Sequence, residues 1–124
     1  DCVSYHGQVQ GELKGQQFKQ AHVFLLPTSY PWEGQPLSII EAMAFSTPVI
    51  SCSHKGIPEL VQDRKTGFLV EPRSHEAIAR SVLEMTDNEK RYSSISRAAR
   101  GHYDAGFRRE VHLENLIDAV FAAR

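Results

Sequence analysis

The chain has 124 residues, of which 41% are hydrophobic and 23% are charged, and its formal net charge is −1. This length suits a single domain with its own core, and this composition is that of an ordinary globular protein. The near-neutral charge argues against a nucleic-acid partner, and no apolar run approaches the ~20 residues that span a bilayer. The two cysteines, Cys2 and Cys52, lack the spacing of metal ligands and predict no disulfide framework, which suits a reducing cytoplasm.

The first part of the chain predicts a strand, a helix, a second strand and a loop. Cys2–Tyr5 is a short apolar run that predicts a strand and ends before a glycine. Gly11–Gln20 carries a weak helical pattern. His22–Leu26 is a continuous apolar run, typical of a strand covered on both faces. Pro27–Gln35 contains two prolines, a glycine and a tryptophan, so we expect a loop there.

The middle of the chain continues the same alternation. Pro36 suits the first turn of a helix that runs to about Phe45. Pro48–Ser51 and Gly67–Val70 predict two further buried strands, and Ile57–Val61 between them predicts a short helical turn.

The remainder of the chain predicts helices. Ser74 is expected to cap the first of them, and the Thr86–Glu89 segment has the pattern of a capping box that opens the next. The inner side of the first helix is expected to carry Ile78, Val82 and Leu83. The last helix has an apolar stripe at helical spacing, formed by Leu113, Leu116, Ile117, Val120 and Phe121.

These elements predict an α/β fold, a Rossmann-like parallel sheet with helices on both faces and a helical C-terminal segment. Ligands of such sheets bind outside the carboxyl ends of the strands. We expect three loops to meet at that edge: the turn at Gly7, the loop that carries Glu33, and the loop that carries His54, Lys55 and Gly56.

Two glutamates stand out beside this edge. Glu41 interrupts a helix that is otherwise apolar, and a buried carboxylate is costly unless a polar group satisfies it. Pro36 places Glu33 in the loop before the helix, so that the two carboxylates can flank a ligand. The helix start from about Leu37 offers backbone N–H groups for a phosphate, and Gly34 allows a close approach. Because carboxylates accept hydrogen bonds from sugar hydroxyls, the arrangement suits a nucleotide sugar.

A purely structural interpretation of the pair is also open. Ser38-Ile-Ile-Glu41 is itself a capping-box pattern, in which Glu41 would bind a backbone N–H. Glu33 would then be an exposed loop charge.

Five blocks of the sequence, in order along nearly the whole chain, carry a resemblance to a known family. They are Pro27-Thr-Ser, Glu33-Gly-Gln-Pro-Leu-Ser-Ile-Ile-Glu-Ala-Met-Ala44, Thr47-Pro-Val-Ile50, Gly56-Ile-Pro-Glu-Leu-Val61 and Gly67-Phe-Leu-Val70. Together they resemble the donor half of retaining GT-B glycosyltransferases of the "glycosyl transferases group 1" family, also called GT4. The resemblance implies that residues 1–124 are a nucleotide-sugar (donor) binding domain of a hexosyltransferase-type enzyme.

The resemblance also implies a role for individual residues. Glu33 would be the catalytic residue that contacts the transferred sugar near the reacting centre, and Glu41 would bind the ribose hydroxyls of the nucleotide. The donor sugar and diphosphate would be held by Gly34, Gln35, Pro36, Leu37, Ser38 and Gly56. The nucleobase would lie near Tyr5, Gly7 and Val9. No cofactor is implied, because the nucleotide sugar is a substrate, and no metal is implied, because the helix dipole and cations neutralise the diphosphate.

The same resemblance implies a partner domain that binds the acceptor, a glycan or a lipid-linked molecule. We interpret the start at Asp1 as a boundary, before which neither that N-terminal domain nor the family's basic pair for the leaving diphosphate is present. We therefore expect little or no transferase activity from the isolated chain. A cytoplasmic location is expected, with the complete enzyme peripheral to the membrane as an alternative, and polysaccharide biosynthesis as the pathway class.

Three residues depart from the family pattern. Gln35 replaces an aromatic or aliphatic residue after Glu-Gly, and Ser46 stands where glycine is common. Lys55 replaces the first glycine of a Gly-Gly pair, and its side chain would either add a cation near the diphosphate or point to solvent.

Two other function classes remain to be weighed. A non-catalytic Rossmann-like module that binds a nucleotide or a protein, such as a receiver domain, would need an acidic residue at a strand end. The expected strands end instead in Tyr5, Leu26, Ser51 and Val70. A phosphorylase would need a further basic phosphate pocket or a cofactor lysine, for which no pattern stands out.

Overall fold

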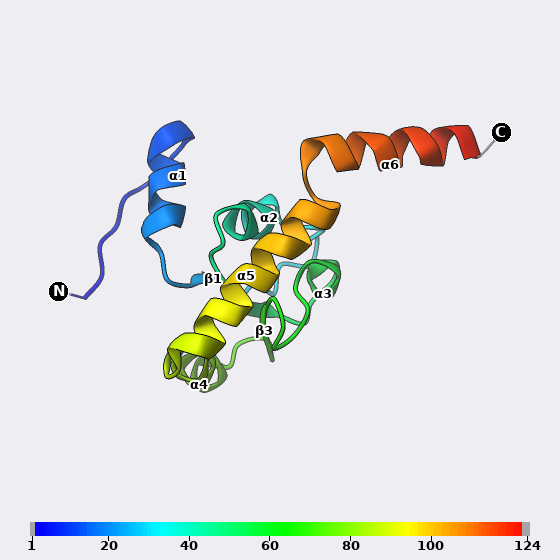
Figure 1. Cartoon of the computed structure of the whole chain (residues 1–124). Coiled ribbons are helices and arrows are strands. Elements are labelled where there is room, and N and C mark those ends of the chain that lie inside the picture. The colour runs from blue at the N-terminus through cyan, green and yellow to red at the C-terminus, as the bar shows by residue number, and fades with distance from the viewer. Residues whose placement is uncertain (1, 123–124) are drawn as a thin grey trace.

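The computed structural model describes residues 2–122, which form a three-stranded parallel sheet flanked by helices (Figure 1). The strands lie in the order β1 (Phe24–Leu26), β2 (Val49–Cys52) and β3 (Gly67–Val70). The helices are α1 (Gly11–Gln20), α2 (Leu37–Ala44), α3 (Ile57–Leu60), α4 (His75–Thr86), α5 (Glu89–Gly106) and α6 (Arg109–Ala122). The predicted α/β class is confirmed.

The register of the sheet brings the ends of its strands to one edge. Leu26 lies opposite Ser51, and Ser51 lies opposite Leu69. The Ser51 hydroxyl donates a 2.6 Å hydrogen bond to the Leu26 carbonyl, which ties β2 to the last residue of β1. The loops that leave β1 and β2 therefore start side by side.

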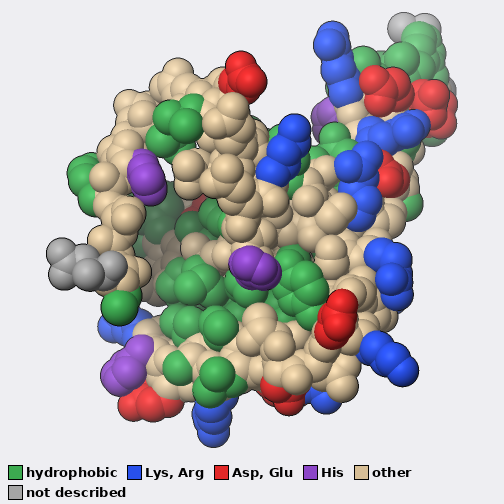
Figure 2. Space-filling view, turned by 60° about the vertical axis from the view of Figure 1, so that its left-hand side comes forward, with side chains coloured by type: hydrophobic (Ala, Val, Ile, Leu, Met, Phe, Trp, Pro, Cys, Tyr) green, Lys and Arg blue, Asp and Glu red, His purple; other side chains and the backbone are tan. Residues whose placement is uncertain are grey.

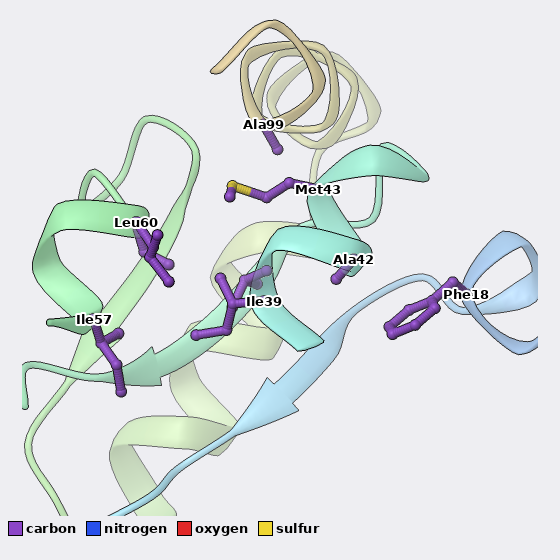
Figure 3. Close-up of a cluster of buried hydrophobic side chains, with 9 residues drawn as sticks. Phe18, Ile39, Ala42, Met43, Ile57, Leu60 and Ala99 are labelled. Carbon is purple, nitrogen blue, oxygen red and sulfur yellow. The ribbon is translucent and has the colours of Figure 1, made fainter. Parts of the chain in front are cut away.

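Successive residues of β2 point to opposite faces of the sheet, and each face has its own core. Val49 faces a cluster that includes Ile39 and Met43 of α2 and Ala99 of α5 (Figure 3). Ile50 faces a second cluster that includes Met85 of α4. Helix α5 contributes to both clusters, since Ile95 belongs to the second and Ala99 to the first, so this helix joins the two layers. These buried contacts hold α2 in place between the sheet and α5.

Helix α2 ends in a well-defined backbone motif. Ser46 has φ 60°, in the left-handed region, and its N–H donates to the Met43 carbonyl at 3.0 Å. The next residue, Thr47, donates its N–H to the Ala42 carbonyl at 3.0 Å. This pair of bonds is a Schellman motif, in which the left-handed residue is usually glycine. Ser46 thus holds a strained conformation where the family pattern has glycine.

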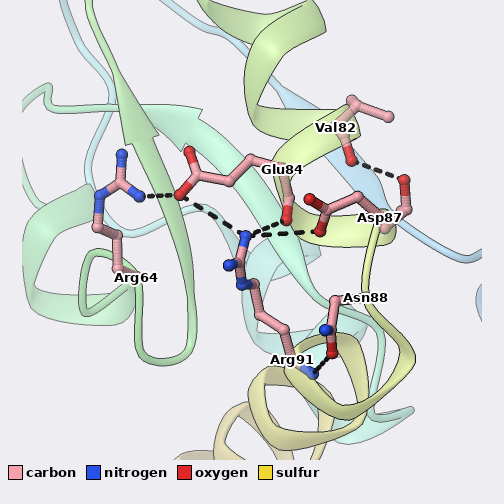
Figure 4. Close-up of polar contacts among 7 residues, drawn as sticks. Arg64, Val82, Glu84, Asp87, Asn88 and Arg91 are labelled. Atoms are coloured by element: carbon pink, nitrogen blue, oxygen red, sulfur yellow. Dashed lines mark hydrogen bonds and ion pairs between the residues drawn. The ribbon is translucent and has the colours of Figure 1, made fainter.

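A network of exposed charges ties the loop before β3 to the junction of α4 and α5 (Figure 4). Arg64 pairs with the Glu84 carboxylate, and Arg91 donates a 2.8 Å hydrogen bond to the Glu84 carbonyl. Asn88 caps α5 by accepting the N–H of Arg91 at 3.0 Å. Because these groups are exposed, each pair contributes only about 0.2–1 kcal/mol.

The predicted strand at Cys2–Tyr5 is wrong. This segment has no regular secondary structure, and the side chains of Val3 and Tyr5 are 85% and 94% exposed. Its apolar composition suits a strand, but a strand needs a neighbour, and no described strand pairs with it.

Two predictions at the ends of α4 and α5 are also wrong, although the Ser74 cap is confirmed. Thr86 does not open α5 but ends α4, where its hydroxyl donates to the Val82 carbonyl at 2.8 Å. Leu83 is 68% exposed, because α4 packs through Met85 and its neighbours on the adjacent side.

The apolar stripe on α6 is not buried in this chain. Helix α6 runs away from the rest of the molecule (Figure 1), and it has no buried residue among those described. The side chains of its apolar stripe are between 45% and 59% exposed; they are Leu113, Leu116, Ile117, Val120 and Phe121. Within residues 2–122, no helix is both long enough and apolar enough to cross a bilayer.

Candidate functional site

The loops that follow β1 and β2 meet, as the sequence predicts. The Gln35 side-chain amide donates a 2.7 Å hydrogen bond to the Glu59 carboxylate at the start of α3. The His54 ring nitrogen Nε2 lies 2.8 Å from the Tyr30 carbonyl. Each bond joins the loop after β1 to the segment after β2, so the two loops form one surface at the carboxyl edge of the sheet.

Two glycines lie close together where these loops meet. A Cβ atom at Gly56 would lie 2.8 Å from the carbonyl oxygen of Gly34 and 3.1 Å from Cγ of Gln35. Gly34 itself has open space around its missing Cβ. The backbone at Gly34 is therefore packed on one side and accessible on the other, which is the geometry that close approach of a ligand requires.

Lys55 lies beside this contact in a left-handed conformation. Its φ is 50°, and its side chain is exposed. A non-glycine residue rarely adopts this region, so the lysine is held there against its preference. Its exposure is compatible with both alternatives for the side chain, a cation near the diphosphate or a charge in solvent.

Glu33 is half-buried in the loop after β1, where its N–H donates to the Tyr30 carbonyl at 3.1 Å. The neighbouring Trp32 is 83% exposed, so its ring does not bury itself on the scaffold.

Glu41 has a partner that sequence reasoning missed. Lys14 Nζ on α1 lies 2.7 Å from Oε1 and 2.7 Å from Oε2 of the Glu41 carboxylate. The N-cap of α2 is Pro36, which provides no side-chain hydrogen bond. The capping-box interpretation, in which Glu41 binds a backbone N–H beside Ser38, is therefore wrong. No local pattern points to Lys14, since the pair is separated by 27 positions.

A groove of about 330 Å³ runs between α1 and the start of α2. Its lining combines Val9 and Ser38, two of the predicted site residues, with Lys14, Phe18 and Phe24. In the space-filling view the N-terminal segment and α1 arch over a hollow that contains apolar side chains (Figure 2). Val9 and Ser38 are thus brought together.

The other residues predicted near the nucleobase lie apart from this groove. Tyr5 is 94% exposed, and Gly7, with φ 62°, has open space around its missing Cβ. Neither lines the groove.

A second cavity, of about 520 Å³, lies between α2 and the end of α5. Glu41, Gln35 and Leu37 line it from the α2 side, and Tyr103 and Phe107 line it from the end of α5. Three predicted site residues therefore border this space, and α2 lines both hollows.

The described residues offer few groups for other chemistries. Burial raises the pKa of the Cys52 thiol, and the Glu71 carboxylate raises it further, so this thiol is a poor nucleophile. Among residues 2–122, no three His, Cys, Asp or Glu side chains gather as metal ligands would.

With this geometry established, the chain can be compared with known proteins. The protein-family model described as "Glycosyl transferases group 1" matches residues 1–102. The chain belongs to this family. The matched stretch contains both converging loops and both glutamates.

Known relatives agree with this assignment. The amylovoran biosynthesis glycosyltransferase AmsK of Erwinia amylovora is 32% identical over an alignment of 125 positions, which covers 97% of this chain and 30% of AmsK. Sucrose-phosphate synthase (tll1590) from Thermosynechococcus elongatus superposes with a TM-score of 0.83 at 29% identity, over 98% of this chain and 31% of that one.

A further solved structure, Anabaena Alr3699/HepE in complex with UDP, shares the fold with a TM-score of 0.78 at 21% identity. The match covers 88% of this chain and 29% of that one. The superpositions confirm the Rossmann-like fold of the GT-B kind. The chain spans about a third of the length of these proteins.

Proposed function

We propose that this chain is the donor-binding domain of a retaining GT4 glycosyltransferase, which moves a sugar from a nucleoside diphosphate to an acceptor. The observation that carries the proposal is the contact between the loops after β1 and β2 at the start of α2. Glu33 lies in the first loop, Gly56 in the second, and Glu41 about one turn into the helix.

The chemistry of this edge suits the parts of a sugar nucleotide. The start of α2 carries the positive end of a helix dipole, which favours the diphosphate. Gly34 has open space for close approach on its free side, and the Glu33 and Glu41 carboxylates accept hydrogen bonds from hydroxyls. In this arrangement Glu33 takes the transferred sugar, Glu41 takes the ribose, and the groove beside Val9 takes the nucleobase.

In the reaction, the bond from the sugar to the diphosphate breaks, a bond from the sugar to the acceptor oxygen forms, and the proton of the acceptor hydroxyl passes to the departing diphosphate. The departing diphosphate carries negative charge, which the dipole of α2 and nearby cations stabilise. Exposed Lys55, next to Gly56, is one such cation in this proposal. The acceptor binds to a second domain, and neither a metal nor a cofactor takes part.

Polysaccharide biosynthesis is the proposed pathway class, since the name of AmsK assigns it to amylovoran biosynthesis. A nucleoside diphosphate is the proposed leaving group, in keeping with the UDP complex of the structural neighbour HepE. The chain spans about a third of these relatives, so we expect it to bind the donor but to turn over little of it alone.

Calorimetric titration tests the proposal directly. UDP, GDP and ADP, followed by their sugar conjugates, are titrated into the wild-type chain and into Glu41→Gln and Glu33→Gln variants. We expect one nucleoside diphosphate to bind, Glu41→Gln to weaken it about tenfold, and Glu33→Gln to reduce only the added affinity of the sugar.

Glu76→Gln is the matched control, because Glu76 is an exposed glutamate on α4 that lies outside both loops. Absence of binding by every nucleotide, or equal losses in all three variants, would refute the proposal. Robust sugar transfer by the isolated chain would contradict the expected need for a second domain.

A further inference from the structure

The ion pair between Lys14 and Glu41 is placed where it can affect ligand recognition. The ammonium lies 2.7 Å from each carboxylate oxygen, and the two side chains are 38% and 41% exposed. An ion pair this accessible contributes little to folding stability. We therefore expect the pair to affect the positions of the two side chains more than the stability of the fold.

The pair attaches the part of α1 that the core does not hold. Phe18 is the buried residue of α1, and its ring stacks on Phe45 with centroids 5.8 Å apart. The Thr47 hydroxyl also donates to the Phe18 carbonyl at 2.8 Å. Lys14 lies one turn before Phe18, so its bond to Glu41 fixes the earlier half of α1 against α2.

Lys14 also borders the groove between α1 and α2. It shares this lining with Val9 and Ser38. Ser38 and Glu41 are three positions apart on α2 and so lie on one face of that helix. The Lys14 side chain therefore both lines the groove and contacts the Glu41 carboxylate.

We propose that Lys14 is a positioning residue for ribose recognition: it holds the Glu41 carboxylate so that its remaining lone pairs face the ribose hydroxyls of a nucleoside diphosphate whose base lies in the groove. Each carboxylate oxygen can accept two hydrogen bonds, and Lys14 occupies one on each. The second acceptor site on each oxygen stays open for the 2′- and 3′-hydroxyls. This inference rests on the proposed function, since it assumes that Glu41 meets a ribose.

The expected consequence is selectivity for ribose over 2′-deoxyribose. A site that is prepared to accept a hydroxyl rejects the analogue that lacks it, because its polar group is left without a partner. Without Lys14, the Glu41 side chain can adopt several rotamers. Ribose binding must then restrict it to one of them, and this loss of conformational entropy lowers the affinity.

The experiment compares the affinity for a ribonucleotide with that for its 2′-deoxy counterpart. UDP, GDP and ADP are first titrated calorimetrically into the wild-type chain, and the tightest of them is then compared with its 2′-deoxy form. The variants are Lys14→Gln and Lys14→Met, which remove the charge, and Lys14→Arg, which keeps it. Lys90→Gln, an exposed lysine on α5, is the control for the loss of one positive charge.

We expect the wild-type chain to prefer the ribonucleotide about tenfold, the effect of one hydrogen bond to a charged group. Lys14→Gln and Lys14→Met should reduce this ratio to about two- to threefold, mainly through weaker ribonucleotide binding. Lys14→Arg and Lys90→Gln should keep it. The unfolding midpoint should stay unchanged in all four variants, which separates positioning from a structural role.

An unchanged or larger ratio in Lys14→Gln and Lys14→Met would overturn the inference and leave the proposed function intact. The inference would also be overturned if the wild-type chain binds nucleotides without preferring ribose. Unfolding of both variants would overturn it too, because Lys14 would then be a structural residue. Absence of nucleotide binding by the wild-type chain would overturn the proposed function and this inference with it.

Discussion

Helices α2 and α6 both carry apolar side chains at helical spacing, but their surroundings are opposite. In α2, Ile39, Ala42 and Met43 are completely buried between the sheet and α5. In α6, Leu116 and Ile117 are about half exposed, and the helix runs outward from the rest of the chain (Figure 1). Apolar patterning thus marks a helix face that favours burial, but it does not say which surface buries it.

The difference also separates the tasks of the two helices. The buried face of α2 lets its start and its Glu41 be held in one place, as a binding site requires. The exposed stripe of α6 is an apolar surface of the kind that marks interaction sites. Four substitutions test how sharply the two helices differ, in order of decreasing effect.

The largest effect is expected in the core beneath α2. Met43→Ala should lower the free energy of unfolding by about 2–5 kcal/mol, because it opens a cavity at a completely buried position. Urea denaturation measures this. Met43→Leu, which conserves volume, should cost less than about 1.5 kcal/mol. Equal losses in the two variants would show that α2 is not tightly packed.

The next effect concerns the loop contact at the start of α2. Gly56→Ala should cost about 1–3 kcal/mol, because the new Cβ would lie 2.8 Å from the Gly34 carbonyl and would push the loops apart. Thermal unfolding gives the loss.

Gly34→Ala is the matched control for this contact, since open space surrounds its Cβ position and its stability should hardly change. The same control sharpens the proposed function. If the donor approaches Gly34, that variant should bind nucleotide sugars more weakly while it unfolds normally. Normal binding by Gly34→Ala would place the donor elsewhere.

A smaller and opposite effect is expected where α2 ends. Ser46→Gly should raise stability by about 0.5–1 kcal/mol, because glycine accepts the left-handed conformation at φ 60° without strain. Chemical denaturation measures the gain. Ser46→Ala keeps the Cβ and should give none, so a gain in that variant would attribute the effect to the hydroxyl and not to the backbone.

The smallest effect is expected on α6. Leu116→Ala should change the free energy of unfolding by less than about 0.5 kcal/mol, since this side chain is 51% exposed. Denaturation under the conditions used for Met43→Ala makes the two comparable. A loss of more than about 1 kcal/mol would mean that α6 is buried in solution, either by self-association or by folding back onto the chain.

Most of the fold could be predicted because the residues next to each helix and strand mark where it begins and ends. The ranges predicted for the first helix, Gly11–Gln20, and the last strand, Gly67–Val70, coincide with α1 and β3. The Cys2–Tyr5 segment failed because strand formation depends on a neighbour as well as on composition. The Thr86 cap failed because more than one residue of the Thr86–Glu89 segment can cap a helix, and Asn88 is the one whose side chain reaches the Arg91 N–H.

The site could be predicted only in part, for a related reason. Glu33, Gly34 and Gly56 come from recognisable blocks, and the meeting of their loops follows from parallel strands that end at one edge. The Lys14–Glu41 pair depends on how α1 lies against α2, which is set by Phe18 in the core. Such a contact is decided by tertiary packing and leaves no local pattern.

The open side of β1 has a consequence of its own. Within residues 2–122, β1 pairs with β2 alone, so the peptide groups along its other side have no strand beside them. An edge of this kind accepts any extended segment, because main-chain hydrogen bonds need no particular side chain. A neighbouring strand could therefore widen the sheet without disturbing the register of β2 and β3, and the loops at the carboxyl edge would keep their places.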